Sequence, residues 1–307
     1  MDKKIFVIIN SYYLGDILLV NPLVQNIKRI YKDAYVVMLS NKTYYEAAKN
    51  QKGVDEVIIW DRKNKHKSIF GTLKFILTFP YKNIYAVFPI YGMDRPTILG
   101  RLLNPKYNVA LNKGDFAGKF LKYEYENFYK MSQIQEQHLS LLKGITKEDT
   151  INCKMEYNPI PFDFKYKDYI CLCPVSSRKE KDMPYDTVVE IIKNAKNKVI
   201  LLGTGSVSKE LSEKLKAENL DNLIDFSNKT SINEAGWILK NSIGTISVDT
   251  GLLHLSLAVG AKTVGLFYTD DTKFFIPDKK IYDNSETVED KAPLNILSSL
   301  YKLINGD

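Results

Sequence analysis

Runs of apolar residues alternate with amphipathic stretches along the first half of the chain. Segments that are apolar throughout are typical of parallel β-strands covered on both faces. Such segments predict strands at residues 4–9, 34–39, 56–60 and 84–88. Apolar residues at helical spacing predict helices at residues 17–31, 44–50, 69–81 and 131–144. This alternation indicates βαβ units and a parallel sheet.

The second half of the chain repeats the alternation. It predicts strands at residues 169–173, 198–202, 223–226, 244–248 and 262–267, and helices at 184–195, 208–218, 252–259 and 293–304. Between the halves, residues 157–165 contain two prolines and no periodicity, which indicates a linker. We therefore expect an α/β protein with two Rossmann-like domains, residues 1–156 and 169–307, a linker at 157–168, and a ligand in the cleft between the domains. The last helix could also pack back on the first domain.

Length and composition agree with two globular domains. The chain has 307 residues, of which 45% are hydrophobic and 26% charged, and these are ordinary values for a globular protein. Its three cysteines, Cys153, Cys171 and Cys173, make neither a disulfide framework nor a zinc site. The beginning of the chain lacks a signal-peptide pattern, and no apolar run reaches membrane-spanning length. We therefore expect a cytoplasmic protein.

Positive charge is concentrated in the first half of the chain. Residues 1–150 hold 23 Lys and Arg against 14 Asp and Glu, a net charge of +9, whereas residues 151–307 hold 20 against 22, a net charge of −2. The excess favours an anionic membrane surface, an anionic substrate or nucleic acid as a partner, although a solvated basic surface has the same composition. The apolar and aromatic segment 69–81 either lies on a membrane surface or packs as an ordinary helix on the first domain.

Three polar turns follow predicted strands, at the edge where an open α/β sheet binds its ligand. In the first turn, Gly15 permits a tight bend, and Asp16 is either the cap of the next helix or a reactive carboxylate. In the second turn, Ser176, Ser177 and Lys181 supply two hydroxyls and a positive charge. These groups suit a diphosphate, although a charged loop of this kind is often only solvated.

The third turn joins a buried strand to a short apolar helix. Asp249 and Thr250 precede the helix, and Gly251 lets a ligand approach the backbone closely. Because a helix begins with unpaired N–H groups and a positive dipole end, this turn predicts a phosphate-binding site. Leu252 and His254 follow in the first helical turn, where His254 either lines the site or supports the turn.

A fourth turn, around Gly203 and Gly205, also lies between a strand and a helix. It lacks the third glycine of a dinucleotide-binding fingerprint, so we do not assign NAD to it. Asp270 and Asp271 are not accompanied by other clustered metal ligands, so we expect no metal site.

Taken together, these turns resemble the signatures of glycosyltransferase family 9, the bacterial heptosyltransferase family. Residues 246–267 resemble its C-terminal signature, and residues 14–16 after the first strand resemble its N-terminal signature. The loop 174–184 and the helical segment 136–144 are also similar to the family, so the resemblance covers nearly the whole chain. The sequence differs from the family pattern at Tyr13, Met183 and residues 268–271.

The resemblance implies an inverting, metal-independent glycosyltransferase with the GT-B fold and no cofactor. Asp16 would then be the catalytic base that removes the proton of the acceptor hydroxyl. The donor, for which ADP-heptose is the first expectation, would bind through its diphosphate. The resemblance places Ser176, Ser177, Lys181, Thr250 and Gly251 on the diphosphate, and Gly15, Gly203, Asp249, Leu252 and His254 along the rest of the donor site.

The same resemblance implies an anionic, lipid-linked saccharide as the acceptor, such as a lipopolysaccharide or lipooligosaccharide core. The first domain would bind it, and the candidate contacts are Arg95, Arg101, Lys113 and Lys119. Such an acceptor would bring the protein to the inner membrane as a peripheral protein, and we expect no nucleic-acid partner. Two alternatives stay open: a sugar-nucleotide epimerase of the same fold, and a non-enzymatic basic protein that binds RNA or another polyanion.

Overall fold

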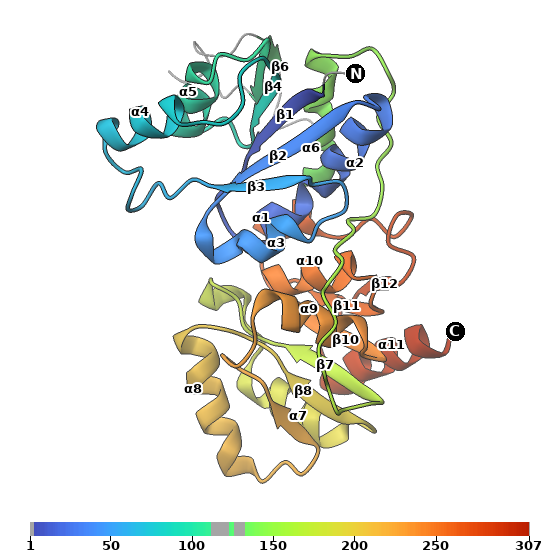
Figure 1. The fold of residues 1–307 in the computed structure, drawn as a ribbon. Coiled ribbons are helices and arrows are strands. Elements are labelled where there is room, and N and C mark those ends of the chain that lie inside the picture. The colour runs from blue at the N-terminus through green and yellow to red at the C-terminus, as the bar shows by residue number, and fades with distance from the viewer. Residues whose placement is uncertain (1–2, 112–122, 126–132, 307) are drawn as a thin grey trace. The chain divides into compact units, whose positions relative to one another are not determined.

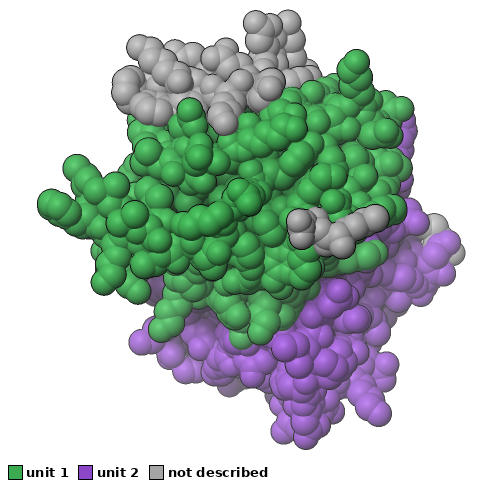
Figure 2. Space-filling model, turned by 45° about the horizontal axis from the view of Figure 1, so that its top comes forward, with its two compact units in different colours: residues 1–153 green, residues 154–307 purple. Residues whose placement is uncertain are grey.

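The computed structural model describes residues 3–111, 123–125 and 133–306. The chain divides into two compact units, residues 1–153 (unit 1) and residues 154–307 (unit 2), which are coloured separately in Figure 2. Each unit contains a parallel sheet flanked by helices (Figure 1). The expected fold class, α/β with two Rossmann-like sheets, is confirmed.

In the described part of unit 1, the strands form a six-stranded sheet in the order β3-β2-β1-β4-β5-β6. Neighbouring strands are parallel, and β1 pairs with β2 from Lys4 opposite Ala34 to Ile9 opposite Leu39. The chain order reverses between β1 and β4, and such a switch point is where open α/β sheets bind ligands. The strands are β1 (Lys4–Ile9), β2 (Ala34–Ser40), β3 (Glu56–Ile59), β4 (Ile84–Pro89), β5 (Tyr107–Leu111) and β6 (Tyr123–Tyr125).

The helices of unit 1 follow the amphipathic stretches, and two of the predicted helices are divided or shortened near a proline. The helix predicted over residues 17–31 is two helices that meet at Val20, because Pro22 lacks the N–H that a continuous helix needs and favours a helix start. The helix predicted over residues 69–81 ends at Leu77, since Pro80 disfavours helical backbone just before it. The helices are α1 (Leu14–Leu19), α2 (Asn21–Ile30), α3 (Tyr45–Lys49), α4 (Ile69–Leu77), α5 (Asp94–Leu102) and α6 (Ile134–Ser140).

Helix α6 lies within the segment predicted as helical at residues 131–144, of which residues 131 and 132 lie outside the described residues. It continues as a short 3-10 helix over Leu141–Gly144. Helix α5 was not predicted, because Pro96 and Gly100 interrupt its apolar pattern.

Unit 2 repeats the strand order of unit 1. Its parallel sheet runs β12-β11-β10-β7-β8-β9, so the chain order reverses between β7 and β10. The strand predictions are confirmed to within two residues, and the short polar strand β12 was not predicted. The strands are β7 (Tyr169–Cys173), β8 (Lys198–Leu201), β9 (Leu223–Asp225), β10 (Gly244–Val248), β11 (Thr263–Leu266) and β12 (Ser285–Thr287).

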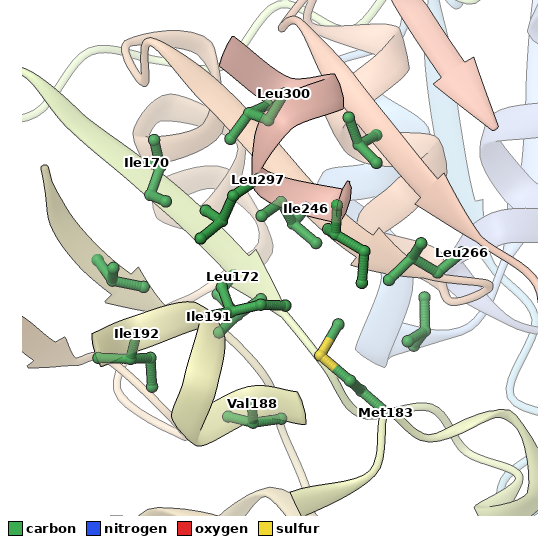
Figure 3. Close-up of a cluster of buried hydrophobic side chains, with 14 of the residues drawn as sticks. Ile170, Leu172, Met183, Val188, Ile191, Ile192, Ile246, Leu266, Leu297 and Leu300 are labelled. Carbon is green, nitrogen blue, oxygen red and sulfur yellow. The ribbon is translucent and has the colours of Figure 1, made fainter. Parts of the chain in front are cut away.

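Among the residues of unit 2 that the structure describes, five helices alternate with the strands along the chain and cover the faces of this sheet. They are α7 (Tyr185–Asn194), α8 (Ser206–Leu215), α9 (Ile232–Lys240), α10 (Gly251–Ala258) and α11 (Pro293–Asn305). Figure 3 shows strand residues such as Leu172 and Ile246 packed against Ile191 of α7 and Leu297 of α11. A Cβ atom at Gly244 would lie 2.7 Å from Leu300 Cδ1, so the glycine lets α11 pack closely on the sheet. The last helix therefore belongs to the core of unit 2.

The segment predicted as a linker packs along unit 2 without forming a helix or a sheet strand. The Tyr157 N–H donates to the Ala258 carbonyl at 2.9 Å, and the Tyr157 side chain is buried. The backbone of Ile160 exchanges two hydrogen bonds with the Asn233 side chain, at 2.7 and 2.9 Å. The domain boundaries expected from the sequence stay a prediction. No helix in the part of the chain that the structure describes is both long and apolar enough to cross a membrane.

Candidate functional site

Asp16 lies just beyond the carboxyl end of β1, in the first turn of α1. Two donors hold its carboxylate: the Tyr13 backbone N–H bonds Oδ2 at 3.2 Å, and the Tyr91 hydroxyl donates to Oδ1 at 2.7 Å. The Asn10 side chain donates to the Asp16 carbonyl at 2.8 Å. The N-cap residue of α1 is Tyr13 rather than Asp16, and Asp16, the third residue of the helix, accepts from the N-cap N–H as in a capping box. The contact with Tyr91 joins Asp16 to a second strand end and orients a carboxylate that is only half-buried.

Tyr91 is a candidate site residue that sequence reasoning missed. It follows β4, the neighbour of β1 across the switch point. Its backbone φ is 68°, and that of Gly92 is 56°. A non-glycine residue in this left-handed region costs roughly 1–3 kcal/mol that surrounding contacts must offset. The only signal in the sequence was a turn after a predicted strand, and nothing in it showed that this strand lies beside β1.

Aromatic contacts surround the Tyr91 side chain, and burial keeps its hydroxyl protonated. Its ring centroid lies 5.3 Å from that of Tyr12 and 5.7 Å from that of His138. Burial, followed by the charge of Asp16, raises the pKa of Tyr91 well above its usual value. The hydroxyl therefore stays protonated at neutral pH and donates to the carboxylate.

Two further side chains complete this aromatic cluster. Burial lowers the pKa of His138, on α6, to about 4, so the ring is neutral at pH 7. Its Nδ1 atom lies 3.1 Å from the Leu19 carbonyl oxygen, which fits a tautomer with the proton on Nδ1. Burial also raises the pKa of Tyr12, and Arg62, whose guanidinium group lies 4.7 Å from the Tyr12 ring centroid, opposes that rise.

At the switch point of unit 2, the structure brings together two residues predicted for the donor site. Lys181 Nζ lies 2.5 Å from Asp249 Oδ2, and the two side chains are only 11% and 6% exposed. Lys181 follows β7 and Asp249 follows β10, so the ion pair joins the two central strands at their carboxyl ends. Breaking a pair this deeply buried leaves a charge without compensation, which costs roughly 3–5 kcal/mol.

His254 extends this arrangement along α10. Its Nε2 atom lies 3.9 Å from Asp249 Oδ1, and its ring centroid lies 6.2 Å from that of Phe275. The Lys181 ammonium lies 5.9 Å from the same Phe275 ring centroid. Three residues chosen from the sequence, Lys181, Asp249 and His254, thus form one contiguous group.

The loop after β7 is closed on itself. The Ser176 N–H donates to Asp182 Oδ1 at 2.6 Å, and the Met183 N–H donates to the Pro174 carbonyl at 2.9 Å. Burial raises the pKa of Asp182. Met183, where the sequence differs from the family pattern, is buried in the core of unit 2, whereas Ser177 is exposed.

The turn after β10 leads directly into α10. Thr250 is the N-cap residue and makes no side-chain hydrogen bond to the helix. Thr250, Gly251 and Leu252 are all partly exposed. An accessible N-terminus of a helix offers backbone N–H groups to an anion.

The loop around Gly203 is locked to the loop that follows β9. The Asn228 N–H donates to the Gly203 carbonyl at 2.8 Å, and the Gly205 N–H donates to Asn228 Oδ1 at 2.7 Å. A Cβ atom at Gly203 would lie 2.4 Å from Ser208 Oγ, so a larger residue at this position would require the Ser208 side chain to move.

The structure places two of the four candidate acceptor contacts. The Arg95 guanidinium group donates to the carbonyls of His66 and Lys67 at 3.0 and 2.9 Å, so it ties the segment before α4 to α5. Arg101 lies in the last turn of α5. Lys113 and Lys119 lie outside the described residues.

The two switch points define a GT-B fold, and solved glycosyltransferases share it. A family 9 glycosyltransferase from Veillonella parvula DSM 2008 matches with a TM-score of 0.85 at 14% identity, covering 100% of this chain and 99% of that chain. ADP-heptose lps heptosyltransferase II of E. coli matches with a TM-score of 0.80 at 15% identity, covering 99% of both chains. E. coli heptosyltransferase WaaC with ADP matches with a TM-score of 0.78 at 16% identity, covering 98% of this chain and 99% of that chain.

The family model of glycosyltransferase family 9 (heptosyltransferase) matches residues 120–295, more than half of the chain. The chain therefore belongs to glycosyltransferase family 9 and is a glycosyltransferase. The epimerase and the non-enzymatic polyanion binder give way to this assignment. No curated protein matches the chain in sequence.

Proposed function

We propose that the protein transfers a sugar from a nucleotide diphosphate donor to a saccharide acceptor, with inversion and without a metal ion. ADP-heptose is the proposed donor, and a lipopolysaccharide or lipooligosaccharide core, or a similar anionic saccharide, is the proposed acceptor. Membership of family 9 supports the sugar transfer. The similar E. coli proteins, one named for ADP-heptose and one solved with ADP, support an adenine nucleotide.

The geometry around Asp16 carries this proposal. A carboxylate has about four lone-pair positions, and Tyr91 and Tyr13 each occupy one. The remaining positions can accept the proton of the acceptor hydroxyl as its oxygen attacks the anomeric carbon. The bond from that carbon to the diphosphate breaks, and its electron pair leaves with the nucleotide. Asp16 is thus the proposed general base, and Tyr91 is proposed to hold it in position.

The leaving diphosphate needs positive charge and hydrogen-bond donors. We assign this role to Ser176, Ser177, Lys181 and the N-terminus of α10 at Thr250 and Gly251. Lys181 can donate to a phosphate while it keeps its contact with Asp249, because an ammonium group has three donors.

The remaining parts of the donor and acceptor sites are assigned by their place in the fold. The donor site is proposed to be lined by residues that follow β8 and β10, at the same edge of the sheet as the residues assigned to the diphosphate. They are Gly203, Asp249, Leu252 and His254, and Gly15 of unit 1 is proposed to join them. The positive charge of the first half would favour an anionic acceptor. Because the proposed acceptor is lipid-linked, we also propose peripheral association with the inner face of the membrane.

A ligand panel tests the donor, and a transfer assay tests the reaction. ADP and ADP-heptose should raise the melting temperature more than UDP, GDP and their sugars, because a ligand that binds only the folded protein stabilises it. With ADP-heptose and a core saccharide truncated before its heptose, mass spectrometry should find one added heptose, which Asp16→Asn should prevent. A response to UDP-sugars alone would refute the donor assignment. No response to any nucleotide, together with no transfer, would refute the proposed function.

A further inference from the structure

Helix α4 exposes large apolar side chains to solvent. Ile69, Phe70 and Leu77 are 78%, 84% and 79% exposed, and Leu73 is 46% exposed. Phe75 is the buried residue of the helix and packs against His66 and Phe79. A surface helix normally turns its apolar stripe inward and a polar face outward. In α4 the outward face is also apolar.

The exposed face does not result from a loosely held helix. The Ser68 hydroxyl caps the helix by accepting from the Gly71 N–H at 3.0 Å. The Thr72 hydroxyl donates to the His66 carbonyl at 3.1 Å. A Cβ atom at Gly71 would lie 2.5 Å from the Lys65 carbonyl oxygen, so the preceding segment packs tightly on the helix. With the Arg95 contacts to the same segment, these bonds fix α4 beside α5 at the edge of unit 1 (Figure 1).

The surroundings of the exposed face are basic. Residues 62–93 contain six Lys and Arg and no Asp or Glu. Lys63, Lys65 and Lys67, just before the helix, and Lys74 within it are exposed. An apolar face bordered by four exposed lysines fits a surface that is apolar inside and negative at its boundary.

We propose that α4 docks unit 1 onto the surface of an anionic lipid bilayer, with Ile69, Phe70, Leu73 and Leu77 in the headgroup region and Lys63, Lys65, Lys67 and Lys74 on the phosphates. A helix of nine residues is too short to span a bilayer, which takes roughly 20 residues, so it lies in the plane of the interface. A second copy of the chain on this face would bring two sets of lysines together, and like charges disfavour that pairing. Anionic headgroups supply the opposite charge instead.

The inference deepens the proposed function, because it names the surface that brings the enzyme to a lipid-linked acceptor. It can nevertheless be tested without donor or acceptor. Flotation of the full chain with vesicles of equal parts phosphatidylglycerol and phosphatidylcholine should recover the wild-type protein with the lipid. Less protein should be recovered with vesicles of pure phosphatidylcholine or at high salt.

The variant that tests the apolar part is Phe70→Ser with Leu77→Ser, since both side chains are exposed and the fold should survive. Vesicle binding should fall by about ten-fold or more, because two large apolar side chains leave the lipid. The matched control is Ile160→Ser with Leu294→Ser, two exposed apolar residues of unit 2 that are 60% and 63% exposed, which should bind as the wild type does. Lys63→Gln with Lys65→Gln and Lys67→Gln should weaken binding only to the anionic vesicles. In all variants, transfer to a water-soluble acceptor fragment should stay near the wild-type rate.

Equal vesicle binding by the wild type and the Phe70→Ser, Leu77→Ser variant would overturn the proposal, as would a wild type that fails to float. A wild-type dimer that this variant converts to a monomer, measured by light scattering, would also overturn it and assign α4 to self-association. Vesicle binding that follows the expected pattern in a protein with no transfer activity would sustain the docking surface and remove the proposed function. The two ideas therefore fail in distinguishable ways.

Discussion

Units 1 and 2 share one strand order, and each places an aspartate beyond the carboxyl end of a strand at its switch point. In unit 1, neutral donors hold Asp16: the Tyr91 hydroxyl and the Tyr13 N–H. In unit 2, Asp249 is almost fully buried and paired with the ammonium group of Lys181. The carboxyl edge of each sheet thus carries an aspartate, with open coordination after β1 in unit 1 and with its charge compensated by a lysine after β10 in unit 2. The groups around each carboxylate decide whether it can act as a base.

The largest effect should come from the open carboxylate. Asp16→Asn keeps the shape of the side chain but removes its basicity, so turnover should fall by at least ~10²-fold while calorimetry finds the ADP affinity near the wild-type value. Asp94→Asn is the matched control, since Asp94 also lies in the first turn of a helix of unit 1 and is exposed. Turnover within a few-fold of wild type would reduce Asp16 to a helix cap.

In unit 2 the comparison predicts a loss of stability instead. Lys181→Ala leaves Asp249 buried without its partner, so the free energy of unfolding should fall by roughly 3–5 kcal/mol. ADP binding should weaken more than AMP binding if Lys181 also contacts the distal phosphate. Lys179→Ala, at an exposed lysine of the same loop, serves as the control in urea unfolding. An unchanged midpoint would show that the buried pair contributes little.

Acidic pH should lower the stability of the protein through His138, which belongs to the aromatic cluster around Tyr91. The folded pKa of His138 is about 4, whereas an unfolded histidine titrates near 6.5. Below about pH 6.5 the unfolded chain binds a proton first, so stability is fully present above that pH and is lost as the pH falls toward 4. The loss should reach about 3 kcal/mol, and His138→Gln should flatten the dependence of the melting temperature on pH over this range. A wild-type protein with no such dependence would contradict the neutral buried ring.

A smaller loss of activity is expected when Asp16 is kept but the hydrogen bond that orients its carboxylate is removed. Tyr91→Phe removes one hydrogen bond to the carboxylate, so kcat should fall by roughly 10-fold with little change in donor affinity or acceptor KM. Tyr166→Phe, which removes a hydroxyl from a partly exposed ring in unit 2, should leave both parameters unchanged. A raised KM with normal kcat would place the Tyr91 hydroxyl on the acceptor rather than on Asp16.

The smallest expected effect is none. Chelation with EDTA should leave the transfer rate unchanged, since hydroxyls, Lys181 and the N-terminus of α10 are proposed to stabilise the leaving group. A rate that falls on chelation and returns with magnesium or manganese would show that the reaction needs a metal ion, and would turn attention to Asp270 and Asp271.

Local patterns predicted most of the fold and part of the candidate site. The strands at residues 4–9, 169–173 and 244–248 have the predicted bounds, because a buried parallel strand is a continuous apolar run. Short or interrupted elements, such as β12 and α5, carry too little pattern to be seen. The sequence also singled out the carboxylates and the lysine after the central strands.

Contacts between distant segments could not be predicted from one sequence. Lys181 and Asp249 are separated by 68 positions, and Tyr91 and Asp16 by 75. Their pairing depends on which strands become neighbours and, for Tyr91, on a left-handed backbone that only the surrounding contacts hold in place. The strand pairing and the backbone conformation of Tyr91 are both set by tertiary contacts.

The segment before β7 also determines where unit 2 can be cut from the chain. Tyr157 fills the space above Gly236, where a Cβ atom would lie 2.9 Å from the Tyr157 ring. The Phe164 ring packs edge-on against Tyr169 and tilted against Phe226, with its centroid 5.6 and 5.5 Å from theirs. A fragment that begins at β7 would therefore lack part of its own interior. The compact unit 2 begins at residue 154, so we expect a stable fragment of this unit to need the proline-containing stretch as well as the sheet.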